Sequence, residues 1–252
     1  MFTKPKDTPQ LWHARLGHLG NDNLSKLVDK KMVTGITLKP SDIKAASTTP
    51  CDSRAVGKST RLPFSESETV YDTPLEMVST DVCGPMEKPT PSGAKYFLTV
   101  IDHATDYSVT VPMKKKAEVP TNLKDIFAKL ETTTGNKVKN VRTDNGGEYC
   151  SEHLETYFKS RGIHHQTTMP YTSQQNGKAE RLNRTLMDKA VTMLTAANMP
   201  KRFWGEAVMT ANHLRNLSPT SGKSLTPYEL LHKRKPNVSY LRAFGATAYA
   251  HI

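Results

Sequence analysis

The chain has 252 residues, 36% of them hydrophobic and 7% aromatic, which suits one substantial folded core with a smaller module and is unlike a disordered chain. Lysine and arginine together number 35 against 24 acidic residues, so the net charge of +11 favours a polyanionic partner such as nucleic acid. Three cysteines without paired spacing argue against a disulfide framework. The lack of a long apolar run predicts an intracellular protein with no membrane partner.

The first region, residues 9–64, has a histidine-rich start and a short helical pattern, and is predicted to form a small helical module. Its core is expected to use the apolar residues Leu11, Trp12, Leu16, Leu19, Leu24, Leu27, Val28 and Val33. The polar, turn-rich sequence SESETVYDTP at 65–74 is typical of a linker.

Strands and helices alternate in the second region, which begins at residue 75. Five strands are predicted, at 75–82, 95–102, 106–112, 137–144 and 163–168. A helical face runs from Val119 to Gly135, and Ser151 is a good N-cap for a helix that Gly162 closes.

Two further helices are expected after the last strand, a long one from about 177 to 198 and another that Pro200 opens. This order predicts an α/β fold with a mixed five-stranded sheet flanked by helices, plus the small helical N-terminal module. We therefore place the core and its C-terminal helices at 75–235. The strand-like segment 236–252 is predicted to be the start of a truncated C-terminal β module.

Three acidic residues lie where predicted strands end or a predicted helix begins. Asp81 lies near the end of the first strand, Asp144 ends the fourth strand, and Glu180 lies in the first turns of the long helix. Any one of them alone would be an ordinary surface acid, because strand ends and helix N-termini favour acids. Together they suit two Mg²⁺ ions about 3.5–4 Å apart, the arrangement that clamps the attacking and leaving oxygens in phosphoryl transfer.

The segments around these acids, LEMVSTDVCGPM, VRTDNGGEY and PYTSQQNGKAERLNRTL, resemble the catalytic blocks of copia-type retrotransposon integrases. The 35 residues between Asp144 and Glu180 match the D,D(35)E spacing of retroviral integrases and related transposases. The similarity runs from LWHARLGHLG to the last residues of the chain. It implies a ribonuclease H-like fold, dependence on two Mg²⁺ or Mn²⁺ ions, and Asp81, Asp144 and Glu180 as catalytic metal ligands.

The resemblance also implies a function. A retrotransposon integrase nicks DNA and joins retroelement 3′ ends to target DNA, and it would work as a homo-oligomer in the nucleus and in cytoplasmic virus-like particles. Two alternatives stay open: a catalytically idle DNA-binding or assembly remnant, and a ribonuclease H-type RNA nuclease on the same fold. The intact triad argues against the first, and the spacing and the QQNG loop favour integrase over the second.

Basic and amide side chains surround Glu180 in the sequence, on the long helix and on the loop before it. The residues expected to contact DNA are Gln174, Gln175, Asn176, Lys178, Arg181 and Arg184. The alternative for each is a solvated helix or loop.

The N-terminal block LWHARLGHLG is similar to the zinc module of the copia-type family, in which two histidines join two cysteines. His13, His18 and Cys51 are present, but Arg54 stands where the second cysteine is expected. A guanidinium cannot ligate Zn²⁺, and three ligands fall short of the four of a structural site. We therefore expect an incomplete zinc site and weak or absent zinc binding.

Overall fold

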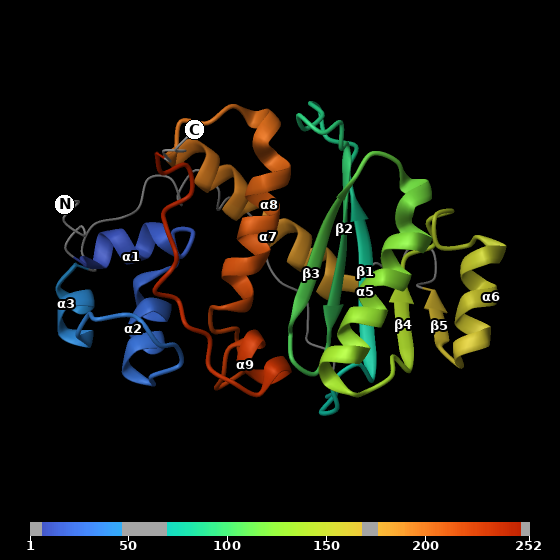
Figure 1. The fold of residues 1–252 in the computed structure, drawn as a ribbon, viewed down its shortest axis with the longest axis horizontal. Coiled ribbons are helices and arrows are strands. Elements are labelled where there is room, and N and C mark those ends of the chain that lie inside the picture. Colours follow the sequence, from blue (N-terminus) through green and yellow to red (C-terminus); the bar gives the residue numbers. More distant parts are fainter. Residues whose placement is uncertain (1–6, 47–69, 168–175, 248–252) are drawn as a thin grey trace, which may run out of the picture.

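The computed structural model describes residues 7–46, 70–167 and 176–247. Its centre is a mixed sheet with the strand order β3-β2-β1-β4-β5 (Figure 1). The strands are β1 (Met77–Cys83), β2 (Tyr96–Asp102), β3 (Ser108–Met113), β4 (Asn140–Thr143) and β5 (His164–Thr167). β2 pairs antiparallel with β1 and with β3, whereas β4 pairs parallel with β1 and with β5. The predicted fold class and all five strands are confirmed.

Helices cover both faces of the sheet. They are α5 (Val119–Thr134), α6 (Glu152–Arg161), α7 (Gly177–Ala196), α8 (Trp204–Asn216) and α9 (Pro227–His232), with 3-10 helices η2 (Lys116–Glu118) and η4 (Lys201–Phe203). Leu98 and Val100 of β2 belong to one core cluster with α5 and α6, while Phe97 and Ile101 belong to another with α7 and α8. Successive side chains of a strand point to opposite faces, so β2 is buried on both sides.

The fourth strand is shorter than predicted, because the backbone N–H groups of Val138 and Lys139 bond outside the β1–β4 register. The Val138 backbone N–H donates to Glu131 Oε1 of α5 across 3.1 Å, and the Lys139 N–H donates to the Leu75 carbonyl across 3.1 Å. β4 therefore begins only at Asn140.

The N-terminal region forms α1 (Pro9–Arg15), α2 (Asn21–Asp29) and α3 (Pro40–Ala45). The buried residues Trp12, Leu16, Leu19, Leu24 and Leu27 match the prediction, and Met32 and Ile43 add to them. These side chains share one continuous core cluster with α7 and α8. The contact is close at Gly17, since a Cβ there would lie 2.9 Å from Leu214 Cδ1. The two predicted regions thus share one core.

The described part of the C-terminal segment, residues 236–247, contains no strand, and this part of the β-module prediction is wrong. The segment instead runs back along the N-terminal helices (Figure 1). Asn237 forms an isolated bridge with Thr34, and Val238 and Leu241 are buried in the shared core. Phe244 is partly buried against the same cluster, whereas residues 245–247 are exposed; residues 248–252 lie outside the described part. No helix within the described ranges is long and apolar enough to cross a membrane.

Candidate active site

Asp81 and Asp144 lie at the same end of two adjacent parallel strands. Ser79 of β1 pairs with Arg142 of β4, so this register continued by two residues brings Asp81 level with Asp144. Glu180 lies in the first turn of α7, which packs across β1 and β2. The β1–β4 pairing and the crossing of α7 thus bring the three acids to one side of the sheet, as the sequence predicts.

Asp81 is half-buried and accepts two hydrogen bonds. The Val82 N–H donates to its Oδ1 and Asn183 Nδ2 donates to its Oδ2, each across 2.9 Å. Burial, followed by the neighbouring Asp144 and Glu180 carboxylates, raises the pKa of Asp81 to about 6, although the two hydrogen bonds lower it. Mutual repulsion of this kind is relieved by a cation, so the donor set fits a divalent metal ion, which prefers oxygen ligands.

The described residues do not place three His, Cys, Asp or Glu side chains ready to hold one metal ion. Glu180 is exposed in the first turn of α7. Convergence of the three carboxyl groups at one common point therefore stays a prediction.

The loop that carries Asp144 is held by polar contacts on both of its sides. The Gly146 N–H donates to Asp144 Oδ1 across 3.1 Å. Tyr149 is fully buried, and its hydroxyl lies 3.2 Å from Thr80 Oγ1, next to Asp81. Glu148 is also buried and forms an ion pair of 2.8 Å with Lys116 Nζ.

Lys116 is the last of three consecutive lysines, at 114–116. Its partner Glu148 is 32 residues away in the chain. Glu148 and then Asp144 raise the pKa of the Lys116 amine, which places this cation beside the carboxylate site. No local pattern predicts this contact.

Two asparagines connect α7 to the central strands. Asn183 donates to Asp81, and its Oδ1 accepts from the Thr99 hydroxyl of β2. Asn176 is buried and donates from Nδ2 to the Thr80 carbonyl across 3.2 Å. Asn176 is therefore an internal anchor in this structure, not the accessible DNA contact that we expected.

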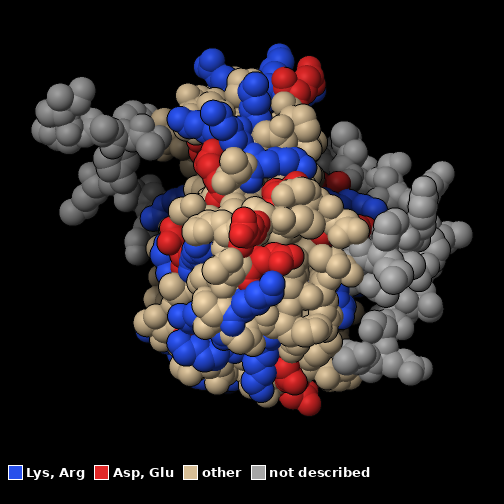
Figure 2. Space-filling view, turned by 90° about the vertical axis from the view of Figure 1, so that its right-hand side faces the viewer, with Lys and Arg blue, Asp and Glu red and all other residues tan. Residues whose placement is uncertain are grey.

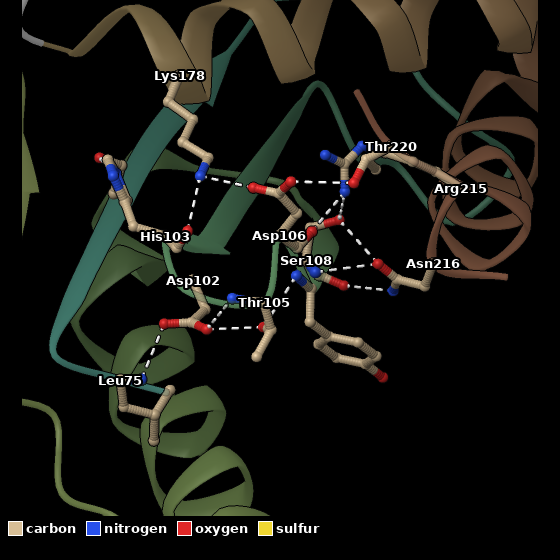
Figure 3. A network of polar contacts seen from close by, with 12 residues as sticks. Leu75, Asp102, His103, Thr105, Asp106, Ser108, Lys178, Arg215, Asn216 and Thr220 are labelled. Carbon is tan, nitrogen blue, oxygen red and sulfur yellow. Dashed lines mark hydrogen bonds and ion pairs between the residues drawn. The ribbon is translucent and has the colours of Figure 1, made fainter. Parts of the chain in front are cut away.

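Lys178, another expected DNA contact, is instead engaged within the protein (Figure 3). Its Nζ lies 2.6 Å from Asp106 Oδ1 and donates to the His103 carbonyl across 3.0 Å. The other Asp106 carboxylate oxygen accepts from the Thr220 hydroxyl, and Arg215 donates to the Asp106 carbonyl. The turn between β2 and β3 is thus tied to the first turn of α7 and to the C-terminal end of α8.

Arg181 and Arg184, unlike Asn176 and Lys178, are placed where they could contact DNA. Both side chains are exposed, and neither forms a hydrogen bond or ion pair with another described residue. Gln174 and Gln175 lie outside the described residues.

On the face at the α6 end of the molecule, acidic side chains gather near the centre with basic ones around them (Figure 2). The net positive charge is therefore not concentrated in one patch on that face.

His13 and His18 lie together, as a pair of zinc ligands would. His13 Nδ1 donates to the Leu19 carbonyl across 2.8 Å, because a carbonyl can only accept. His13 Nε2 then faces His18 Nδ1 at 3.2 Å. A histidine oriented by a backbone carbonyl is typical of metal sites. Cys51 and Arg54 lie outside the described residues, so the remaining ligand positions are not placed.

Two family models match the chain. One is the integrase core domain, at residues 72–173, and the other is the GAG-pre-integrase domain, at residues 1–59. The fold is also similar to a chain of the cryo-EM structure of a simian T-cell lymphotropic virus intasome in complex with PP2A regulatory subunit B56 gamma. That similarity has a TM-score of 0.54 at 18% identity, and covers 89% of this chain and 74% of that one.

The chain is also similar to plant retrotransposon proteins. It is 40% identical over 96% of its length to the retrovirus-related Pol polyprotein from transposon TNT 1-94 of Nicotiana tabacum, covering 18% of that protein. The corresponding polyproteins from transposons RE1 and RE2 of Arabidopsis thaliana are 33% and 32% identical over 99% of the chain, which covers 17% of each. The chain thus spans less than a fifth of these relatives. It belongs to the integrases of copia-type retrotransposons, with a GAG-pre-integrase domain followed by an integrase core of ribonuclease H-like fold.

Proposed function

We propose that the chain is a DNA strand-transfer enzyme that nicks retroelement DNA ends and joins their 3′ ends to target DNA. The observation that carries this proposal is the register of β1 with β4, which brings Asp81 level with Asp144, while Asn183 of α7, the helix that carries Glu180, donates to Asp81. Burial and then the Asp144 and Glu180 carboxylates raise the pKa of Asp81. Ordinary surface acids would not repel one another in this way. The proposed partners are DNA and further copies of the same chain, and the proposed locations are the nucleus and virus-like particles.

Asp81, Asp144 and Glu180 are the residues that would hold two Mg²⁺ or Mn²⁺ ions. When bound, such ions stabilise charge on the attacking and leaving oxygens of a phosphoryl transfer. Asn183 holds the Asp81 carboxylate in place, and the buried Tyr149 anchors the loop that carries Asp144. Lys178 holds the first turn of α7, two residues before Glu180. Arg181 and Arg184 are proposed to contact DNA phosphates, and Gln174 and Gln175 to line the strand's path.

The test is a strand-transfer assay with labelled DNA ends and Mg²⁺ or Mn²⁺. Asp144→Asn and Glu180→Gln should abolish the joined product, because an amide is a poorer ligand and carries no charge to offset the metal. DNA binding by Asp144→Asn should persist, since phosphate contacts supply most of the affinity. Asp125→Asn, which changes an exposed carboxylate on α5, is the matched control and should stay active.

Two outcomes would contradict the proposal. A wild-type chain that binds DNA and forms no product would be the idle remnant. A chain that cleaves the RNA strand of an RNA–DNA hybrid and joins no DNA would be a ribonuclease H-type nuclease.

A further inference from the structure

A groove of about 420 Å³ lies where α8, α9 and the C-terminal segment meet. Its lining includes Leu217, Tyr228, Arg234, Lys235, Asn237 and Tyr240. None of the three acids of the candidate active site lines it, so it is a separate site.

The walls of this groove are held by hydrogen bonds to the N-terminal region and to α8. The Thr34 N–H donates to the Pro236 carbonyl across 3.0 Å, and the Val238 N–H donates back to the Thr34 carbonyl across 2.9 Å. Tyr240 is held by its hydroxyl, which lies 2.7 Å from His213 Nε2. The groove is therefore already formed in the chain without a ligand.

The groove carries positive charge that the protein itself does not neutralise. Arg234 and Lys235 line the groove, and Lys233 precedes them in the chain. All three are exposed, and none of them takes part in an ion pair within the described ranges. The residues described as lining the groove include no aspartate or glutamate. Three adjacent cations repel one another, so an anionic ligand would stabilise the arrangement.

The groove also presents aromatic rings beside these cations. Tyr240 is 56% exposed, so its ring is accessible to a ligand. The Tyr228 ring lies 4.3 Å from the His232 ring at an interplanar angle of 33°. Cations that bind phosphates next to rings that stack on bases are the features of a surface for single-stranded nucleic acid.

We propose that this groove binds a single strand of DNA, with Arg234 and Lys235 on its phosphates and a base against Tyr240. This inference rests on the proposed function, because it assumes DNA as the substrate class. A volume of this size holds roughly one or two nucleotides and no duplex. An arginine fork suits a phosphate through two parallel hydrogen bonds. The groove would hold an unpaired DNA segment away from the carboxylates.

The experiment measures fluorescence anisotropy of a labelled 12-nucleotide DNA strand with the full chain in EDTA, so that catalysis plays no part. Arg234→Glu with Lys235→Glu should weaken binding at least ten-fold and reduce the slope of log affinity against log salt by about 1.4, or about 0.7 per lost phosphate contact. Tyr240→Ala should weaken binding at least five-fold, whereas Tyr240→Phe keeps the ring and should bind as the wild type does.

The matched control is Lys139→Glu with Lys159→Glu, which makes the same change of charge beside β4 and on α6. β4 and α6 lie towards the far end of the sheet from the N-terminal helices (Figure 1). The control should lose less than two-fold in affinity. An equal loss in the control and the groove variant would overturn the proposal, as would wild-type affinity in the groove variant.

Two further readouts sharpen the result. Bromouracil-substituted DNA should crosslink to the peptide that contains Tyr240, and a crosslink elsewhere would overturn the assignment. Tighter binding of an RNA strand of the same sequence would overturn the choice of DNA. Asp144→Asn should bind the strand normally, so a chain that binds in the groove but joins no DNA would contradict only the proposed activity.

Discussion

Asn183 donates a hydrogen bond from Nδ2 to Asp81 Oδ2 across 2.9 Å and thereby connects α7 to β1. The amide oxygen of Asn183 accepts from Thr99 of the adjacent strand β2. Asn183 is buried, so both of its polar atoms are satisfied within the protein. The candidate catalytic carboxylate is thus oriented by the helix that carries Glu180.

Asn183→Ala is expected to lower strand-transfer activity at least ten-fold. It removes a donor from the Asp81 carboxylate and an acceptor from the Thr99 hydroxyl, which costs about 1–3 kcal/mol of folding stability. The measurements are strand transfer and urea unfolding, with the exposed neighbour variant Thr185→Ala as control. An Asn183→Ala chain with full activity would show that this hydrogen bond does not position Asp81.

The buried Asp81 should make the metal-free chain less stable as pH rises. Its pKa in the folded chain is about 6 against an ordinary value of 3.8, so folding favours the protonated form. Below about pH 4 both states hold the proton and there is no penalty. The penalty grows as pH rises from about 4 to 6 and then stays constant, at roughly 3 kcal/mol or less.

Asp81→Asn should remove this part of the pH dependence. The difference in the free energy of unfolding between variant and wild type, measured in EDTA, should shift in favour of the variant from pH 4 to pH 7. A difference that stays flat over this range would contradict the raised pKa. Asp144→Asn should lower the Asp81 pKa only in part in an NMR titration, because burial, the largest cause, remains.

Lys178 offers a test between a positioning role and a DNA contact. Lys178→Met leaves the Asp106 carboxylate without its cation, so stability should fall by about 1–3 kcal/mol and strand transfer should fall with it. DNA affinity and its salt dependence should not change, and Lys178→Arg should restore activity. The control is Arg181→Met, which removes an exposed cation from the same helix and should reduce DNA affinity. A smaller slope of log DNA affinity against log salt concentration in Lys178→Met would show instead that Lys178 contacts DNA.

Zinc binding provides a test of the N-terminal region. The wild-type chain should hold zinc weakly or not at all after dialysis, and Arg54→Cys should hold one ion per chain tightly, because it completes a set with His13, His18 and Cys51. The measurement is metal analysis of both chains side by side. Tight stoichiometric zinc in the wild type would mean that another residue supplies the fourth ligand.

The sequence alone determined the strands and helices of the core and singled out the three acids as candidate metal ligands. Hydrophobic periodicity and Gly or Ser caps are local signals, so α5 and α6 agree with their predicted positions to within about a residue. The spacing of Asp144 and Glu180 is also a local property of the chain, and with the flanking motifs it pointed to the family.

Only the tertiary structure decided which polar groups meet. Lys178 finds Asp106, and Lys116 finds Glu148, through packing between elements far apart in sequence. The same holds for the C-terminal segment, in which Val238 and Leu241 are buried in the core that the N-terminal helices share. The type of a residue determines whether it is stabilised by burial or by an opposite charge. The packed fold determines which neighbour lies within reach to provide it.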